Sequence, residues 1–119
     1  MQATLIDWSD ALVELLFHYV ITSGAHIASR DTVKAKWNTV NDNFFNHELC
    51  ASIRGKHYTK GNHRKIRDKY KREKAIAQHE MSKGNKSKYE GEVSQLYKNI
   101  KQAIDEEEEH AEELNFKVR

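Results

Sequence analysis

Apolar residues in the first half of the chain recur every three or four positions, which is the spacing of one helix face. A first helix is expected to begin near Asp7 or Ser9, where a side-chain oxygen can cap it, and to end at 22–24. Its apolar side holds Trp8, Leu12, Leu15, Leu16 and Tyr19. A second helix is expected from Asp31 or Thr32 to a frayed end at 46–50, with the stripe Val33, Trp37, Val40 and Phe44.

The second half of the chain predicts two further helices. Residues 51–58 are expected to form a loop or short turn around Gly55, and residues 59–62 to cap a third helix that runs to about Met81. The apolar stripe of this third helix is Ile66, Tyr70 and Ala77. After a hinge at 82–85, a fourth helix from Ser87 carries the apolar residues Tyr89, Val93, Leu96, Tyr97, Ile100 and Ile104. These patterns predict an all-α fold.

Composition supports this prediction and limits the size of the core. The chain has 119 residues, no proline and five glycines, which favours helices in one domain, or in one small domain with an appendage. No window approaches the ~18 apolar residues of a membrane span, and the N-terminus lacks the features of a signal peptide. The single Cys50 cannot form an intramolecular disulfide, which fits a reducing compartment.

Charge is distributed unevenly along the chain. Residues 54–74 contain ten Lys or Arg against two acids, Asp68 and Glu73, whereas the whole protein has a formal charge of only +2. A local excess of about +8 attracts a polyanion, most commonly nucleic acid. We therefore expect a nuclear protein. The run 105–113, with seven acids in nine residues, is expected to form a solvated helix end, or to screen the basic helix as an internal DNA mimic.

Large aromatic residues lie at the centre of three of the stripes, and their pattern resembles a known family. The residues are Trp8 with Leu15-Leu16, then Lys36-Trp37 with Val40 and Phe44, then Arg64, Ile66 and Lys69-Tyr70-Lys71-Arg72. Over roughly residues 5–80, this pattern resembles a Myb/SANT-like DNA-binding domain of the expanded type, as in trihelix factors, MADF domains and the Myb-like proteins of Harbinger transposons. The resemblance implies a three-helix, helix-turn-helix unit at 5–82 whose third helix reads DNA.

The outward side of the third helix and the segment before it supply the candidate DNA contacts. Arginine can pair with guanine in two bonds, and lysine more often meets phosphate. The candidates are Arg54, Lys56, Lys60, Arg64, Lys65, Arg67, Asp68, Lys71 and Arg72.

Two arrangements are open for the fourth helix, within the segment 86–114. Its apolar stripe can fold back on the three-helix unit as additional core, or it can bind a partner helix from a second copy or from another protein. The residues that would bind such a partner are Val93, Leu96, Tyr97, Ile100 and Ile104.

Other chemistry finds little support in the sequence. The zinc-ligand types His47, Cys50, His57 and His63 occur at spacings that match no common zinc finger, and no pairing of a nucleophile with a base is present. We expect a double-stranded DNA-binding protein, or the DNA-binding subunit of a larger complex, without catalysis, cofactor or metal. The alternatives are a SANT-type module that binds protein, such as histone tails, and a helical subunit whose basic face meets an acidic protein.

Overall fold

The computed structural model describes residues 6–82 and 95–118, and the prediction of an all-α fold is confirmed. In these ranges there are α-helices and 3₁₀ turns but no strand. The elements are α1 (Asp10–Ser23), η1 (Ala25–Ile27), α2 (Val33–Asn46), η2 (Glu48–Cys50), α3 (Ala51–His57), α4 (Arg64–Ser82) and α6 (Gln95–Val118). None of the helices in the described ranges is long and apolar enough to cross a membrane.

The ends of α1 lie where the sequence predicts them. The Ser9 hydroxyl accepts a hydrogen bond from the Leu12 amide at 3.3 Å, which satisfies an amide that the first turn leaves free. At the other end, Gly24 has a φ of 75°, and its amide donates to the carbonyls of Val20 and Ile21. Glycine adopts this left-handed conformation without the steric cost that a Cβ would add, so the helix stops there.

The segment expected to be a loop around Gly55 is instead the short helix α3, so this prediction was wrong. A helix of seven residues with an internal glycine has little stability of its own, and tertiary contacts hold it. Ile53 packs against the core, and the Tyr58 hydroxyl donates to Asp42 Oδ1 of α2 at 2.8 Å. Gly61, with a φ of 79°, then forms the turn that leads into α4.

Aromatic rings join α1, α2 and α4. The Tyr70 ring of α4 lies 5.4 Å from the Trp37 ring and 4.9 Å from the Phe17 ring, measured between centroids. Trp8, the large aromatic residue of the first predicted stripe, does not join these rings and stacks on Phe44 at 5.4 Å. Phe17 is therefore the ring that α1 contributes, and Trp8 covers a neighbouring part of the core.

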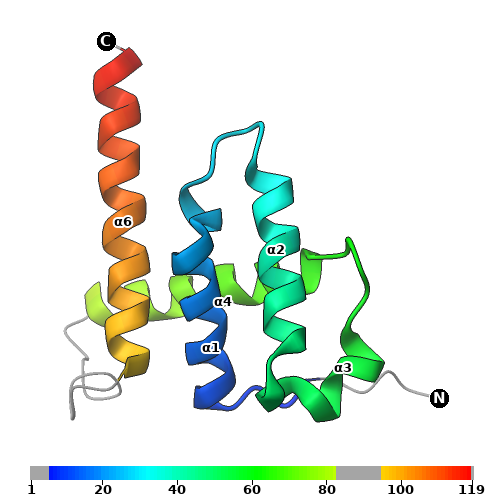
Figure 1. Ribbon diagram of the computed structural model, residues 1–119. Helices are drawn as coiled ribbons and strands as arrows, with labels where there is room; N and C mark the ends of the chain where they lie inside the picture. Colours follow the sequence, from blue (N-terminus) through cyan, green and yellow to red (C-terminus); the bar gives the residue numbers. More distant parts are fainter. Residues whose placement is uncertain (1–5, 83–94, 119) are drawn as a thin grey trace.

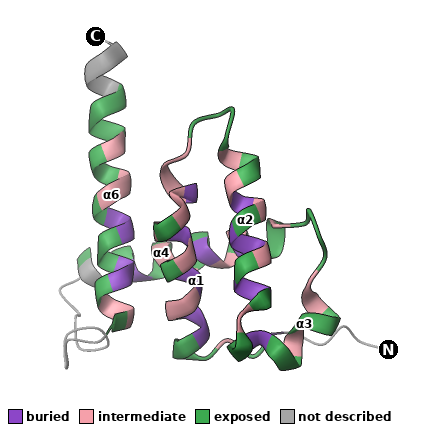
Figure 2. Cartoon of the chain, viewed as in Figure 1, coloured by how far each residue is buried: buried purple, intermediate pink, exposed green. Residues whose placement is uncertain are grey.

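Helix α6 folds back onto the rest of the chain, and its contact with α1 is its most extensive (Figure 1). Ile100, Ala103 and Ile104 are buried in the same core as α1, α2 and α4. Asn99, also buried, donates from Nδ2 to the Glu14 carbonyl of α1 at 3.3 Å. Figure 2 shows that the buried positions of α6 lie in its N-terminal half, whereas exposed positions dominate farther along.

In this packing the stripe of α6 folds back on the rest of the chain as additional core, which is one of the two arrangements that the sequence left open. Ile100 and Ile104 are 1% and 7% exposed, and Leu96 and Tyr97 pack against the same core. Ile100 and Ile104 cannot also contact another molecule unless α6 detaches from α1. Val93 lies outside the described residues. A single hydrophobic core contains residues from both predicted segments, 5–82 and 86–114.

Candidate nucleic-acid interface

The candidate DNA-binding residues lie on α3, on the turn that follows it and on α4. Helix α4 crosses behind α1, α2 and α6 in Figure 1, so that one side faces the core and the other faces away from it. All the candidates are exposed except Arg67, which is half-buried. The exposed residues are Arg54, Lys56, Lys60, Arg64, Lys65, Asp68, Lys71 and Arg72.

The orientation of α4 is set by the residues that it buries. Ile66 is 0% exposed and Tyr70 is 2% exposed, which fixes the inward face of the helix. The opposite face carries Lys65, Asp68 and Arg72, at steps of three and four residues, so these side chains lie along one line. The result is a continuous exposed face with two cations and one acid.

Helix α3 and the turn are fixed to α2 by polar contacts of α2 side chains. The buried Asn41 donates from Nδ2 to the Thr59 carbonyl at 3.2 Å. The bond between Tyr58 and Asp42 anchors the preceding residue, and the Arg54 guanidinium lies 5.3 Å from the centroid of the Tyr58 ring. These contacts hold Lys60 and the cations of α3 in a defined place beside the start of α4.

Two histidines register the positive field at this end of the molecule. The pKa of His57 is lowered by burial and by the charges of Lys65 and Lys56, and the Lys65 ammonium lies 3.1 Å from His57 Nδ1. Burial also lowers the pKa of His63, with contributions from Arg67, Lys34 and Arg64. Nearby cations disfavour the protonated imidazole, so the charges around the two histidines add to the effect of burial.

Lys34 is a member of this cluster that the sequence analysis missed. It is exposed on α2, yet its charge acts on His63 beside the start of α4. The two residues are 29 positions apart (63 − 34) and meet only through the packing of α2 against α4. No local pattern in the sequence carries that information.

Arg67 differs from the other candidates because it turns toward the core. Its guanidinium lies 5.7 Å from the centroid of the Trp37 ring, and its Nε is buried without a hydrogen-bond partner. A cation over an indole is stabilised by the charge distribution of the ring. The prediction that Arg67 points outward with Arg64 and Arg72 was therefore wrong.

Part of the basic run is neutralised inside the molecule. Lys69 pairs with Glu73 at 2.9 Å, and its ammonium lies 5.3 Å from the centroid of the Trp8 ring. Lys74 pairs with Glu107 of α6 at 2.6 Å. The net field of residues 54–74 is thus concentrated on α3, the turn and the first half of α4.

His47, Cys50, His57 and His63, the zinc-ligand residue types in the sequence, do not form a metal site in the described part of the chain. In the ranges that the structure describes, no group of three or more His, Cys, Asp or Glu side chains is placed to hold a metal ion. Cys50 is buried, and desolvation raises the pKa of its thiol to about 11. At neutral pH the thiol is therefore protonated and weakly nucleophilic.

Comparison of the chain with protein-family models, with curated proteins and with solved structures found no match in any of the three. What this protein binds must therefore be inferred from its own surface, charges and packing.

Proposed function

We propose that this protein binds double-stranded DNA, with α4 in the major groove and with α3 and the following turn against the phosphate backbone. The observation that supports this most directly is the outward face of α4, where Lys65, Asp68 and Arg72 are exposed along one line. An α-helix fits the width of the major groove of B-DNA. In this proposal α1, α2 and α4 form a Myb/SANT-like helix-turn-helix unit, and the protein acts in the nucleus as a non-catalytic DNA-binding protein or subunit.

Each residue type on the outward face suits a particular contact. Arg72 can donate two hydrogen bonds to O6 and N7 of guanine, whereas the Asp68 carboxylate can accept one from the amino group of cytosine. In the proposed complex, Lys65 and Arg64, near the start of the helix, meet phosphates. Contacts to base edges specify sequence, and contacts to phosphates supply most of the affinity and its dependence on salt.

Charge argues against the alternative of a module that reads basic histone tails. Such a reader needs an acidic surface, and the outward face of α4 is basic. A group of exposed acids, among them Glu108, Glu109 and Glu112, lies on α6 instead. The remaining alternative, a basic face that meets an acidic protein, predicts no affinity for duplex DNA, so a DNA-binding measurement separates it from our proposal.

Fluorescence anisotropy of a labelled duplex, at several salt concentrations, tests the proposal. If about six basic side chains reach phosphates, the logarithm of the affinity should fall with the logarithm of salt concentration at a slope of about −5. A flat salt response, or no binding at low salt, would overturn the proposal and leave the acidic protein partner as the better explanation.

Matched variants locate the binding surface. We expect Arg72→Ala to weaken duplex binding by about tenfold or more, because one base or phosphate contact is lost. Lys101→Ala removes the same charge from α6. Lys101 is exposed, and its only ion-pair partner among the described residues is Asp105 at 3.4 Å, so this variant should have a much smaller effect on duplex binding. Equal effects of the two variants would show that α4 is not the reading helix.

A further inference from the structure

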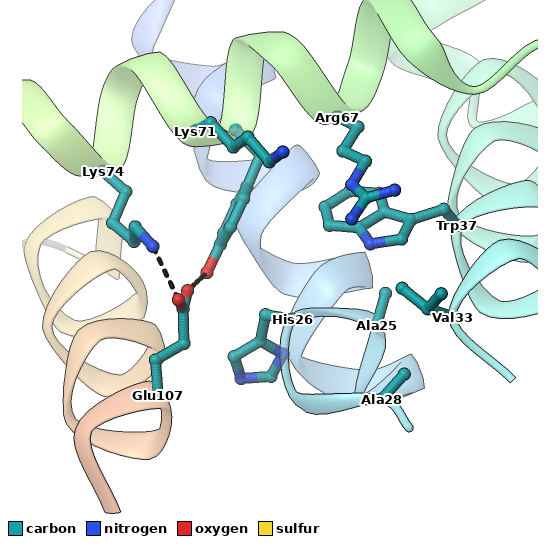
Figure 3. A pocket seen from close by; sticks show the side chains of 10 residues that line it. Ala25, His26, Ala28, Val33, Trp37, Arg67, Lys71, Lys74 and Glu107 are labelled. Atoms are coloured by element: carbon teal, nitrogen blue, oxygen red, sulfur yellow. Dashed lines mark hydrogen bonds and ion pairs between the residues drawn. The ribbon is translucent and has the colours of Figure 1, made fainter. Parts of the chain in front are cut away.

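A polar cavity of about 250 Å³ lies on the side of α4 opposite its outward face. It is formed where α4 meets η1, the start of α2 and the middle of α6 (Figure 3). Its polar and aromatic lining includes Trp37, Arg67 and Lys71, together with His26, Lys74 and Glu107. The cavity is large enough for a small ligand or for one group of a larger one, and the function proposed above makes no use of it.

Two of the residues that line this cavity each have a buried polar atom without a hydrogen-bond partner. One is Nε of Arg67, and the other is Nδ1 of His26, whose side chain is 0% exposed. The opposite ring nitrogen of His26, Nε2, donates to Glu106 Oε1 at 2.7 Å, so the orientation of the ring is fixed. Buried polar atoms in folded proteins are almost always hydrogen-bonded, and two unpaired ones in residues that line the same cavity indicate a missing polar ligand.

The charges around the cavity indicate the sign of that ligand. Glu107 is already occupied, because it pairs with Lys74 at 2.6 Å and accepts a hydrogen bond from the Tyr70 hydroxyl. Arg67 and Lys71 have no ion-pair partner among the described residues, and together they leave two positive charges beside the cavity. In Figure 3 the indole nitrogen of Trp37 faces the space between Arg67 and His26 and adds a neutral donor.

We propose that this cavity binds a phosphate group. The guanidinium of Arg67, the ammonium of Lys71 and the indole N–H of Trp37 approach it from two different helices, which suits a tetrahedral anion with several acceptor oxygens. The phosphate can come from the backbone of a bound nucleic acid or from a free phosphate monoester, and both present acceptor oxygens to the donors of Arg67, Lys71 and Trp37. Only a monoester or inorganic phosphate carries a protonated oxygen that can donate a hydrogen bond to Nδ1 of His26.

The two indole N–H signals in a ¹⁵N NMR spectrum provide the test. Inorganic phosphate is titrated at constant ionic strength against sodium chloride, and the Trp8→Phe variant assigns the two signals. We expect a saturable shift of the Trp37 signal and none of the Trp8 signal, because Trp8 stacks on Phe44 and does not line the cavity. A Trp37 signal that does not move, or that moves equally with chloride, overturns the proposal.

Charge-removing variants show whether the cavity holds the ion. Lys71→Gln should weaken phosphate binding by about tenfold. Because Lys71 is exposed, this substitution leaves the fold intact. Arg67→Gln should weaken it at least as much, whereas Arg72→Gln, on the outward face, should leave it unchanged. If Lys71→Gln and Arg72→Gln have the same effect, the phosphate responds to general surface charge and the proposal fails.

A duplex titration identifies the source of the phosphate. If the duplex moves the Trp37 signal and competes with inorganic phosphate, the cavity holds a backbone phosphate. If the duplex binds without moving that signal, and phenyl phosphate moves it, the ligand is a free monoester. The phosphate titration needs no DNA, so its result stands whether or not the outward face of α4 binds a duplex.

Discussion

Replacing Ile100 with alanine tests whether α6 is part of the folding unit rather than an appended partner-binding helix. Ile100 is 1% exposed and lies in the core that α6 shares with α1. The substitution removes three carbon atoms, adds no polar group and keeps a residue with high helix propensity. Any loss of stability therefore reports packing between α6 and the rest of the molecule.

The expected magnitude follows from the burial of Ile100. At ~0.8 kcal/mol for each buried methylene, three carbons contribute ~2.4 kcal/mol from transfer alone. The cavity left behind adds to this, so the free energy of unfolding should fall by about 3–4 kcal/mol. For a domain of this size, such a loss lowers the melting temperature by roughly 10–15 °C.

Thermal and urea unfolding followed by far-UV circular dichroism measure this change. Leu114→Ala is the matched control, because Leu114 lies on the same helix and is 49% exposed, and it should change stability by less than about 0.5 kcal/mol. If Ile100→Ala unfolds at the same temperature as Leu114→Ala, then α6 does not pack on α1 in solution and the reasoning fails.

Three further predictions concern the arginines, the histidines and the glycines. Arg67→Ala should lower stability by about 1 kcal/mol through loss of its contact with Trp37, whereas Arg72→Ala should leave the melting temperature unchanged and weaken duplex binding in anisotropy. Because the pKa values of His57 and His63 are lowered in the folded protein, these histidines take up protons more readily in the unfolded chain. The free energy of unfolding should therefore decrease as the pH drops below about 6.5. Phosphates favour the protonated rings, so duplex affinity should rise over the same window, and a double His→Gln variant that keeps the full rise would contradict this. Gly61→Ala should lower the free energy of unfolding in urea by about 1 kcal/mol, because Gly61 has a φ of 79°. Gly55→Ala, with open space around its Cβ position, should raise it by about 0.5–1 kcal/mol. Equal changes in the two variants would refute both assignments.

Local rules were sufficient for most of the helices. The oxygen of Ser9, the glycine at 24 and the stripe of α2 act over a few residues, so the bounds of α1 and α2 could be predicted from sequence. Helix α3 could not, because its stability comes from the contacts of Ile53 and Tyr58 with distant parts of the chain. A glycine in a short segment favours a loop when such contacts are unknown.

The candidate interface shows the same division. Residue types and helical spacing placed Lys65, Asp68 and Arg72 together on the exposed face of α4. They also placed Arg67 there, although it is half-buried against Trp37. A helical wheel separates inward from outward positions but cannot decide a position at the border, where a long side chain follows whichever neighbour stabilises it. For Arg67 that neighbour is an indole on another helix.

The acidic residues of α6 explain how a nearly neutral protein presents a basic face. Glu106 pairs with His26, and Glu107 pairs with Lys74 and accepts a hydrogen bond from Tyr70, so two of the acids act on η1 and on the middle of α4. Arg64 and Lys65 at the start of α4 have no ion-pair partner on α6 among the described residues, and both remain exposed. The packing of α6 thus limits the positive field to α3, the turn and the start of α4. Glu107→Gln should extend that field toward Lys74. Non-specific duplex affinity should therefore increase, and the increase should be larger at low salt.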